Sequence, residues 1–112
     1  MASSSRRGGT GQSKQLEVIQ ILVAAGDYHY SRKVSEFIAE GWYEKEDLER
    51  CILYATTIHK IEADEMGTAT DGCKYTILGR DTHGQRFYTC GKIILSPDDQ
   101  RQYFFITAHE AT

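Results

Sequence analysis

The side chains of this sequence that are best suited to chemistry are histidines, tyrosines and cations, most of them in the C-terminal half. His83 and His109 can gain or lose a proton near neutral pH, and Tyr75 and Tyr88 can stack on a base or donate a proton. The candidate catalytic residues are His109, Tyr88 and Lys33, and the candidate substrate-binding residues are Arg80, Arg86, Lys92 and Tyr75. Metal-free RNA cleavage needs a base for a ribose 2′-hydroxyl, an acid for the leaving oxygen and a cation for the phosphate. These residues therefore predict, as one hypothesis, a metal-independent endoribonuclease.

The same residues have a plainer interpretation. A chain with 4 His and 13 Lys and Arg residues contains such a set by chance, and a histidine in an exposed turn is usually solvated. His59 falls in a predicted strand, where a hydrogen-bonded structural histidine is the simpler hypothesis. The acidic residues 62–65 do not match the EF-hand pattern, so we interpret them as a solvated loop and assign no metal or cofactor.

Cys73 and Cys90 offer a second kind of chemistry, zinc binding or a redox pair. An even-numbered hairpin loop would place both residues on one face of a sheet with Cα atoms about 4.5–5.5 Å apart, within disulfide range, whereas an odd loop would place them on opposite faces. The sequence has no Cys-x-x-Cys motif, and buried thiols ordinarily pack as small hydrophobes. Cys51, on the apolar stripe of a predicted helix, is most simply a packing residue.

The element that must position most of these residues is a β-hairpin over residues 71–94. Segments 73–78 and 87–94 are rich in Tyr, Thr, Ile and Phe, and they flank a turn with two glycines. A turn centred on Asp81 and Thr82 predicts that Cys73 faces Cys90, that Tyr75 faces Tyr88 and that Ile77 faces Arg86. Two further strands are expected over residues 57–63 and 103–108.

Three helices are expected before the strands. The first begins at Ser13 as N-cap, is apolar around much of its girth and ends at Gly26. The second spans residues 32–40 after Ser31, and the third spans residues 44–55. The predicted fold is α+β, with two to three N-terminal helices packed on one face of a four-stranded antiparallel β-sheet. Residues 1–12, rich in Ser and Gly, are expected to form a disordered tail before a single domain over residues 13–112.

Charge and composition limit the classes of function. The net charge of −3 argues against nucleic-acid binding through a bulk positive field, although a local basic patch could still act. Three cysteines and the lack of a long apolar run predict a cytoplasmic protein with reduced thiols and no membrane partner. Trp42 and Tyr43, directly after the Gly41 stop, are interpreted as packing residues for the third helix, with contact to a partner as the alternative.

The chain resembles the bacterial family named Domain of Unknown Function 4258. The resemblance runs through Gly26–Asp27–Tyr28, Ser31–Arg32–Lys33–Val34, Ile77–Leu78–Gly79–Arg80 and Thr107–Ala108–His109, and so covers nearly all the chain after the tail. That family is similar in outline to the RelE-like toxins, which place helices on a four-stranded antiparallel sheet. The resemblance thus implies the same fold and a relationship to small ribonucleases.

The departures from the family pattern bear on catalysis. The family's helix-two histidine falls on Lys33, an arginine before its third helix falls on Gly41, and a third-strand histidine falls on Tyr88. The leading hypothesis is therefore a regulatory or interaction domain without catalysis on a RelE-like scaffold. The alternative is the endoribonuclease toxin of a toxin–antitoxin pair, with RNA as substrate. The apolar last strand, if it is an exposed edge, predicts a homodimer or an antitoxin-like partner.

Overall fold

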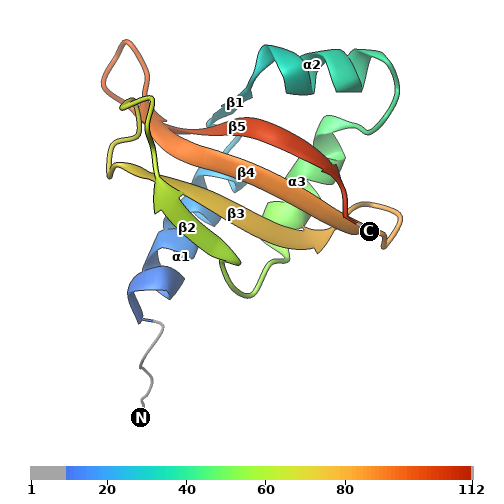
Figure 1. Cartoon of the computed structure of the whole chain (residues 1–112), viewed down its shortest axis with the longest axis horizontal. Coiled ribbons are helices and arrows are strands. Elements are labelled where there is room, and N and C mark those ends of the chain that lie inside the picture. Colours follow the sequence, from blue (N-terminus) through green and yellow to red (C-terminus); the bar gives the residue numbers. More distant parts are fainter. Residues whose placement is uncertain (1–9, 112) are drawn as a thin grey trace.

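The computed structural model describes residues 10–111 as three helices and a five-stranded sheet (Figure 1). The helices are α1 (Thr10–Ala24), α2 (Arg32–Ala39) and α3 (Lys45–Leu53), and the strands are β1 (Tyr28–Tyr30), β2 (Lys60–Ala63), β3 (Cys73–Arg80), β4 (Arg86–Leu95) and β5 (Arg101–Glu110). The strand order is β1-β5-β4-β3-β2, and α1 and α3 lie behind one face of the sheet (Figure 1). The predicted α+β class is confirmed. No helix in the described residues is long and apolar enough to cross a membrane.

The helix ends follow the local signals in the sequence. Ser31 is the N-cap of α2, and its hydroxyl accepts a hydrogen bond from the N–H of Val34 at 3.2 Å, as predicted. After α2, Gly41 adopts a φ of 85°, a conformation that a side chain would disfavour, and the chain turns back. The third helix is shorter than expected, because it ends at Leu53 rather than near residue 55.

The first helix differs from its prediction at both its start and its surface. It begins at Thr10, so Ser13 is not its N-cap and residues 10–12 belong to the helix rather than to a tail. The rest of the predicted tail, residues 1–9, lies outside the described residues. Leu16, Ile19 and Val23 are buried, but Ile21 is 62% exposed, so only one side of this helix is covered.

The sheet has one strand more than predicted, and it is mixed rather than purely antiparallel. Tyr28–Tyr30, expected to be a connector, forms β1 and pairs in parallel with Tyr103–Phe105 of β5. A strand of three residues is too short to show an alternating pattern in the sequence. It forms because it pairs with a strand that is distant in the chain. The predicted strand over residues 57–63 forms only from Lys60 to Ala63.

The last strand is not the exposed edge on which a dimer or antitoxin partner was predicted. β5 lies between β1 and β4, and the N–H of Ser31 continues the β1 pairing by donating to the carbonyl of Phe105 at 2.9 Å. β1 covers only residues 103–105 of β5, so this part of the strand is not open to a partner strand. The homodimer or antitoxin-like partner itself stays a prediction.

The β3–β4 hairpin has a different register from the predicted one. Its loop spans residues 81–85, and the Asp81 carboxylate closes it by accepting the N–H groups of His83 and Gln85 at 2.8 and 2.9 Å. Cys90 consequently faces Thr76 instead of Cys73. The register is thus shifted by three residues from the predicted one. Because this shift is odd, residues that were predicted to face each other lie on opposite faces of the sheet.

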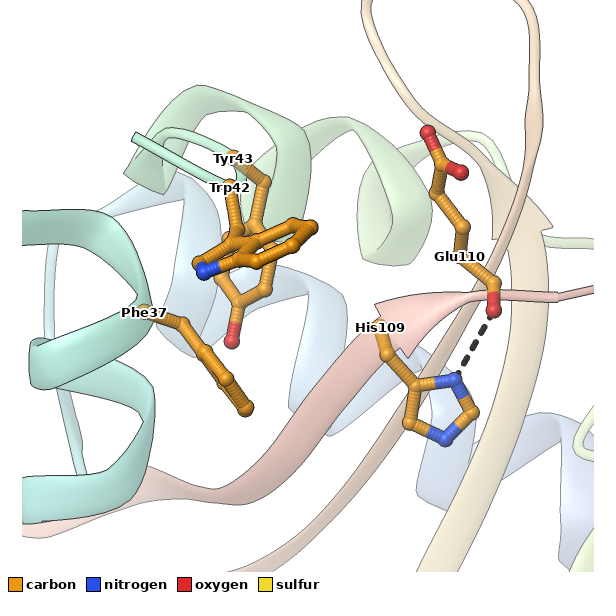
Figure 2. A pocket seen from close by; sticks show the side chains of 5 residues that line it. All are labelled: Phe37, Trp42, Tyr43, His109 and Glu110. Carbon is orange, nitrogen blue, oxygen red and sulfur yellow. Dashed lines mark hydrogen bonds between the residues drawn. The ribbon is translucent and has the colours of Figure 1, made fainter. Parts of the chain in front are cut away.

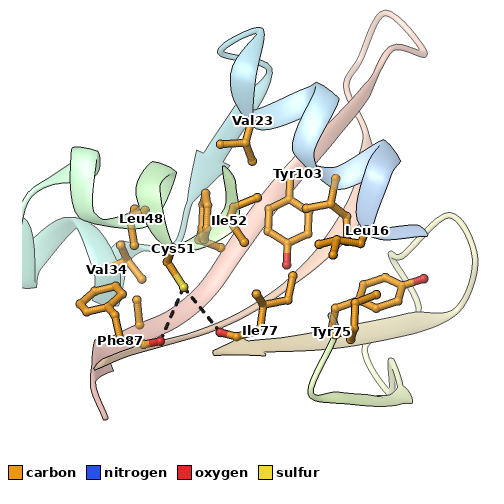
Figure 3. Close-up of a cluster of buried hydrophobic side chains, with 14 of the residues drawn as sticks. Leu16, Val23, Val34, Leu48, Cys51, Ile52, Tyr75, Ile77, Phe87 and Tyr103 are labelled. Carbon is orange, nitrogen blue, oxygen red and sulfur yellow. Dashed lines mark hydrogen bonds between the residues drawn. The ribbon is translucent and has the colours of Figure 1, made fainter. Parts of the chain in front are cut away.

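The core fills the space between the sheet and the helices (Figure 3). Its fully buried members include Ile19 and Val23 of α1, Leu48, Cys51 and Ile52 of α3, and Tyr75, Ile77, Phe87, Tyr103 and Phe105 of the sheet. Two glycines permit close contact. A Cβ on Gly79 would lie 2.6 Å from the carbonyl oxygen of Cys51, and one on Gly91 would lie 2.5 Å from the Tyr103 ring. The sheet face that carries Tyr75 and Phe87 is therefore the packed face, and no helix of residues 10–111 lies over the opposite face (Figure 1).

Candidate functional site

Four of the seven predicted site residues lie together on the helix-free face of the sheet, at the hairpin end. Tyr88 and His109 stack with their ring centroids 4.5 Å apart and their planes at 14°. Arg86 lies two residues before Tyr88 on β4 and therefore on the same face. Arg80 of β3 is the direct cross-strand partner of Arg86. We call these four residues the hairpin-end cluster.

The register of three neighbouring strands creates this cluster. Tyr88 pairs with His109 on one side and with Leu78 on the other, so the aromatic pair extends across two strands and ends on an aliphatic side chain. Tyr88 and Leu78 are partly buried, and His109 is exposed. The stacked rings thus present a flat aromatic surface beside two guanidinium groups.

The electrostatics of the cluster favour an anion. Like charges directly opposite each other destabilise a sheet, by about 0.2–1 kcal/mol for a typical cross-strand pair. Arg80 donates a hydrogen bond to the carbonyl of Gly84 at 2.8 Å, and within the described residues neither it nor Arg86 makes an ion pair with a carboxylate. A phosphate between the two guanidinium groups would offset their repulsion.

Lys92 lies on the same face, but its charge is already paired with a carboxylate outside the cluster. Its ammonium group makes an ion pair with the Asp64 carboxylate at 3.2 Å, and both side chains are buried. Desolvation tends to raise the pKa of Asp64, but hydrogen bonds from the N–H of Ala69 and from Lys92 outweigh it and lower that pKa. The predicted phosphate-binding role of Lys92 conflicts with this pairing. Asp64, interpreted from sequence as part of a solvated loop, instead organises residues 64–69 through its bonds to Met66, Thr68 and Ala69.

Tyr75 and Lys33 do not join the cluster. Tyr75 is on the packed face, where its hydroxyl donates to the Asp71 carboxylate and accepts from Gln15 at 3.1 Å. Burial and the Asp71 carboxylate raise the pKa of Tyr75. The predicted opposition of Tyr75 and Tyr88 is therefore wrong, because Tyr75 pairs with Gly91. Lys33 is an exposed residue of α2, outside the sheet face.

The other histidines and the three cysteines do not form a functional site with the cluster. His83 is exposed at the hairpin turn, and His59 is exposed just before β2. All three cysteines are free thiols, and the odd five-residue loop places Cys73 and Cys90 on opposite faces. Burial raises the pKa of Cys51 to about 11, in agreement with its packing role. Within the described part of the chain, no three metal-ligating side chains converge.

A second concave site lies between α2 and the end of β5 (Figure 2). Its cavity of about 490 Å³ is lined by Phe37, Trp42, Tyr43, His109 and Glu110. Trp42 and Tyr43 were interpreted as packing residues, with contact to a partner as the alternative, and the structure confirms packing for Tyr43 only. Tyr43 is buried against Phe87, with ring centroids 5.3 Å apart, whereas Trp42 is 69% exposed.

This cavity was not predicted from the sequence. Phe37 follows the apolar spacing of its helix, so it was interpreted as a core residue. The only local signal was a pair of large aromatic residues directly after a helix stop. Asp47 was not predicted either, and its carboxylate joins two elements by accepting hydrogen bonds from the N–H of Glu44 and from both the N–H and the hydroxyl of Thr82.

Comparison with known proteins adds no relative. No family model matches this chain, and no curated protein or solved structure matches it either. The resemblance to Domain of Unknown Function 4258 and to RelE-like toxins therefore stays a prediction.

Proposed function

We propose that this protein is an interaction domain that binds single-stranded RNA on the hairpin-end cluster, without catalysis. The observation that carries the proposal is the stacked pair of Tyr88 and His109 beside two guanidinium groups that no described carboxylate neutralises. Aromatic side chains that stack bases, together with cations that contact phosphates, are the usual means of binding single strands.

The geometry suits a strand that runs across β4. A base would extend the stack of Tyr88 and His109, and the adjoining phosphate would lie between Arg80 and Arg86, the next residue pair on the same face towards the hairpin turn. Such a site needs no bulk positive field, which the net charge of −3 would not supply. The affinity would then depend on stacking and on two charge contacts, so we expect weak, salt-sensitive binding.

The test is the affinity for a short fluorescein-labelled single-stranded RNA, measured by fluorescence anisotropy. We expect Tyr88→Leu to weaken binding about tenfold, because stacking of one base contributes about 1–3 kcal/mol. Arg86→Gln is expected to weaken it by a similar factor. Leucine at position 88 keeps an apolar side chain against Leu78, so the sheet should remain folded.

The matched controls are cations outside the cluster. Lys60 lies on another part of the sheet, and its ammonium group already pairs with Glu62 at 3.4 Å, so Lys60→Gln should leave the affinity unchanged. Arg32 of α2 pairs with the Glu36 carboxylate at 3.3 Å, so Arg32→Gln should have no effect either. If the control variants weaken binding as much as the cluster variants, binding is non-specific and the proposed site is wrong.

A second candidate function is metal-independent RNA cleavage, as in the toxin alternative. The observation that favours it is the contact between a histidine and a phenol, two groups able to transfer protons, beside the arginines. Lys33, the third predicted catalytic residue, lies on α2 rather than on this face. Of the predicted catalytic groups, this leaves His109 and Tyr88 as the pair to test.

Cleavage is tested by incubating the protein with cellular RNA in excess EDTA, with and without ribosomes, and reading for cut ends. For the endoribonuclease we expect His109→Ala or Tyr88→Phe to slow cleavage about a hundredfold, a barrier change of about 2.7 kcal/mol. Binding without cleavage would support the interaction domain and exclude the endoribonuclease.

A further inference from the structure

We infer that the cavity between α2 and the end of β5 binds an organic cation, an ammonium or guanidinium group, within three aromatic walls. The walls are Phe37, Trp42 and Tyr43, and we call them the aromatic cage (Figure 2). The cavity shares His109 with the hairpin-end cluster, but its three aromatic walls are other residues. Cations are attracted to the negative faces of aromatic rings, and cages of such rings recognise ammonium groups.

The ring geometry is that of a cage rather than of a stack. Phe37 and Trp42 have centroids 6.5 Å apart with planes at 80°, and Phe37 and Tyr43 have centroids 6.1 Å apart with planes at 56°. Rings inclined in this way direct more than one π-face towards a shared space. A cation needs to lie within about 6 Å of a ring centroid, and the cavity of about 490 Å³ is large enough for a small organic cation.

The charges around the cage select a cation over a neutral apolar group. Glu110 lines the cavity, and the exposed Glu40 carboxylate accepts a hydrogen bond from the Trp42 indole N–H at 3.0 Å. Neither lysine nor arginine is among the residues that line the cavity. Glu110 at the cavity and Glu40 at the edge of the indole therefore give this region a negative charge, with no Lys or Arg among the lining residues to neutralise it.

The Tyr43 hydroxyl gives independent support for a missing ligand. Tyr43 is 8% exposed, and its oxygen has no hydrogen-bond partner in the described chain. Figure 2 shows this hydroxyl pointing towards Phe37, on the cavity side of the ring. A buried hydroxyl without a partner is costly, and it could pair with an N–H of a primary ammonium or guanidinium group or with the hydroxyl of choline.

The cation could belong to a free small molecule or to a basic side chain of a partner protein. The probes are therefore choline and a short peptide that carries trimethyl-lysine, each titrated while the fluorescence of Trp42, the single tryptophan, is followed. Sodium chloride at equal ionic strength is the blank. Tighter binding of choline identifies a small-molecule site, and tighter binding of the peptide identifies a side-chain site. Saturable binding of either probe supports the inference.

The decisive control is the carbon isostere of choline, in which a tert-butyl group replaces the trimethylammonium group. We expect it to bind at least about fivefold more weakly than choline, because only the cation interacts with the ring quadrupoles and the carboxylates. If the isostere binds as tightly, or if neither probe binds, the inference is wrong.

Two variants locate the site by calorimetry, which does not need the tryptophan signal. Trp42→Ala removes an exposed wall and should weaken choline binding about tenfold while the protein stays folded. Tyr54→Ala removes an exposed tyrosine elsewhere and should change nothing. Equal losses in the two variants would place the cation outside the cage and contradict the inference.

Discussion

Two tyrosine hydroxyls, those of Tyr43 and Tyr103, are buried without a hydrogen-bond partner in the described chain, and they have different surroundings. Tyr43 lines a cavity, whereas Tyr103 is fully buried in the core, with its ring against Gly91. Burial raises the pKa of Tyr43 to about 12 and raises that of Tyr103 well above its ordinary value, so both remain protonated donors. A hydroxyl in the core has no partner to gain, but a hydroxyl at a cavity can pair with a ligand that enters it.

The Tyr103 hydroxyl should therefore reduce stability. We expect Tyr103→Phe to raise the free energy of unfolding by about 1 kcal/mol, because it removes an unpaired polar group and keeps the ring. Urea denaturation followed by circular dichroism measures this change. A variant that is less stable than the original protein would mean that the hydroxyl has a partner, and the assignment would fail.

The residues of the candidate site were predictable by type but not by position. Arg80, Arg86, Tyr88 and His109 were selected because of what their side chains can do, and the structure brings them together. Tyr75 was selected in the same way and lies in the core, because side-chain type carries no information about which face of a strand it occupies. That face follows from the register, and the register follows from the Asp81 bonds in the hairpin turn.

At the scale of elements, one carboxylate joins α3 to the hairpin that carries the arginines. Asp47 accepts the N–H of Glu44 at the start of the helix and two hydrogen bonds from Thr82 in the turn. Desolvation alone would raise the pKa of Asp47, but these hydrogen bonds outweigh it and lower the pKa. The ionised carboxylate is therefore the form that the fold stabilises.

This contact predicts a pH-dependent stability. Asp47→Ala should cost about 2 kcal/mol of unfolding free energy near neutral pH, since charged hydrogen bonds at a helix start are lost. Because the folded pKa is depressed, the contribution is complete above the unfolded pKa of about 4 and is lost as the pH falls through the folded value. Chemical denaturation of both proteins at several pH values checks this expectation. A cost that stays constant down to about pH 2 would contradict it.

The elements themselves were predictable where their evidence is local. Apolar spacing and caps indicated α2 between Ser31 and Gly41, because a helix makes its contacts within a few residues. β1 was missed, since Tyr28–Tyr30 becomes a strand only through pairing with residues 103–105. The same long-range pairing makes β5 an interior strand over residues 103–105, so the premise of a wholly exposed edge was wrong there, and the partner itself stays a prediction.

For the whole molecule, the distribution of charge is more informative than its total. The net charge is −3, yet Arg80 and Arg86 oppose each other at the hairpin end, and Glu40 and Glu110 lie by the aromatic cage. The two surfaces therefore favour ligands of opposite charge. A single net value could not predict this, because it averages over both.

Salt dependence tests the number of phosphate contacts. Each phosphate contact to a single strand contributes a slope of about −0.7 to a plot of log affinity against log salt concentration. One phosphate held between two arginines predicts a slope of about −0.7, and Arg86→Gln should reduce its magnitude. A slope that the substitution leaves unchanged would show that Arg86 does not contact the phosphate.

The most direct test of the RNA site is a map of amide chemical-shift changes as a short single-stranded RNA is added to ¹⁵N-labelled protein. RNA binding at the hairpin-end cluster predicts that the largest changes fall on residues 78–89 and 107–110, with little change in α1 and around Lys60. The same titration of Arg86→Gln should give smaller changes at the same positions. Changes centred on the helices, or no saturable change at all, would contradict the proposal that this sheet face binds RNA.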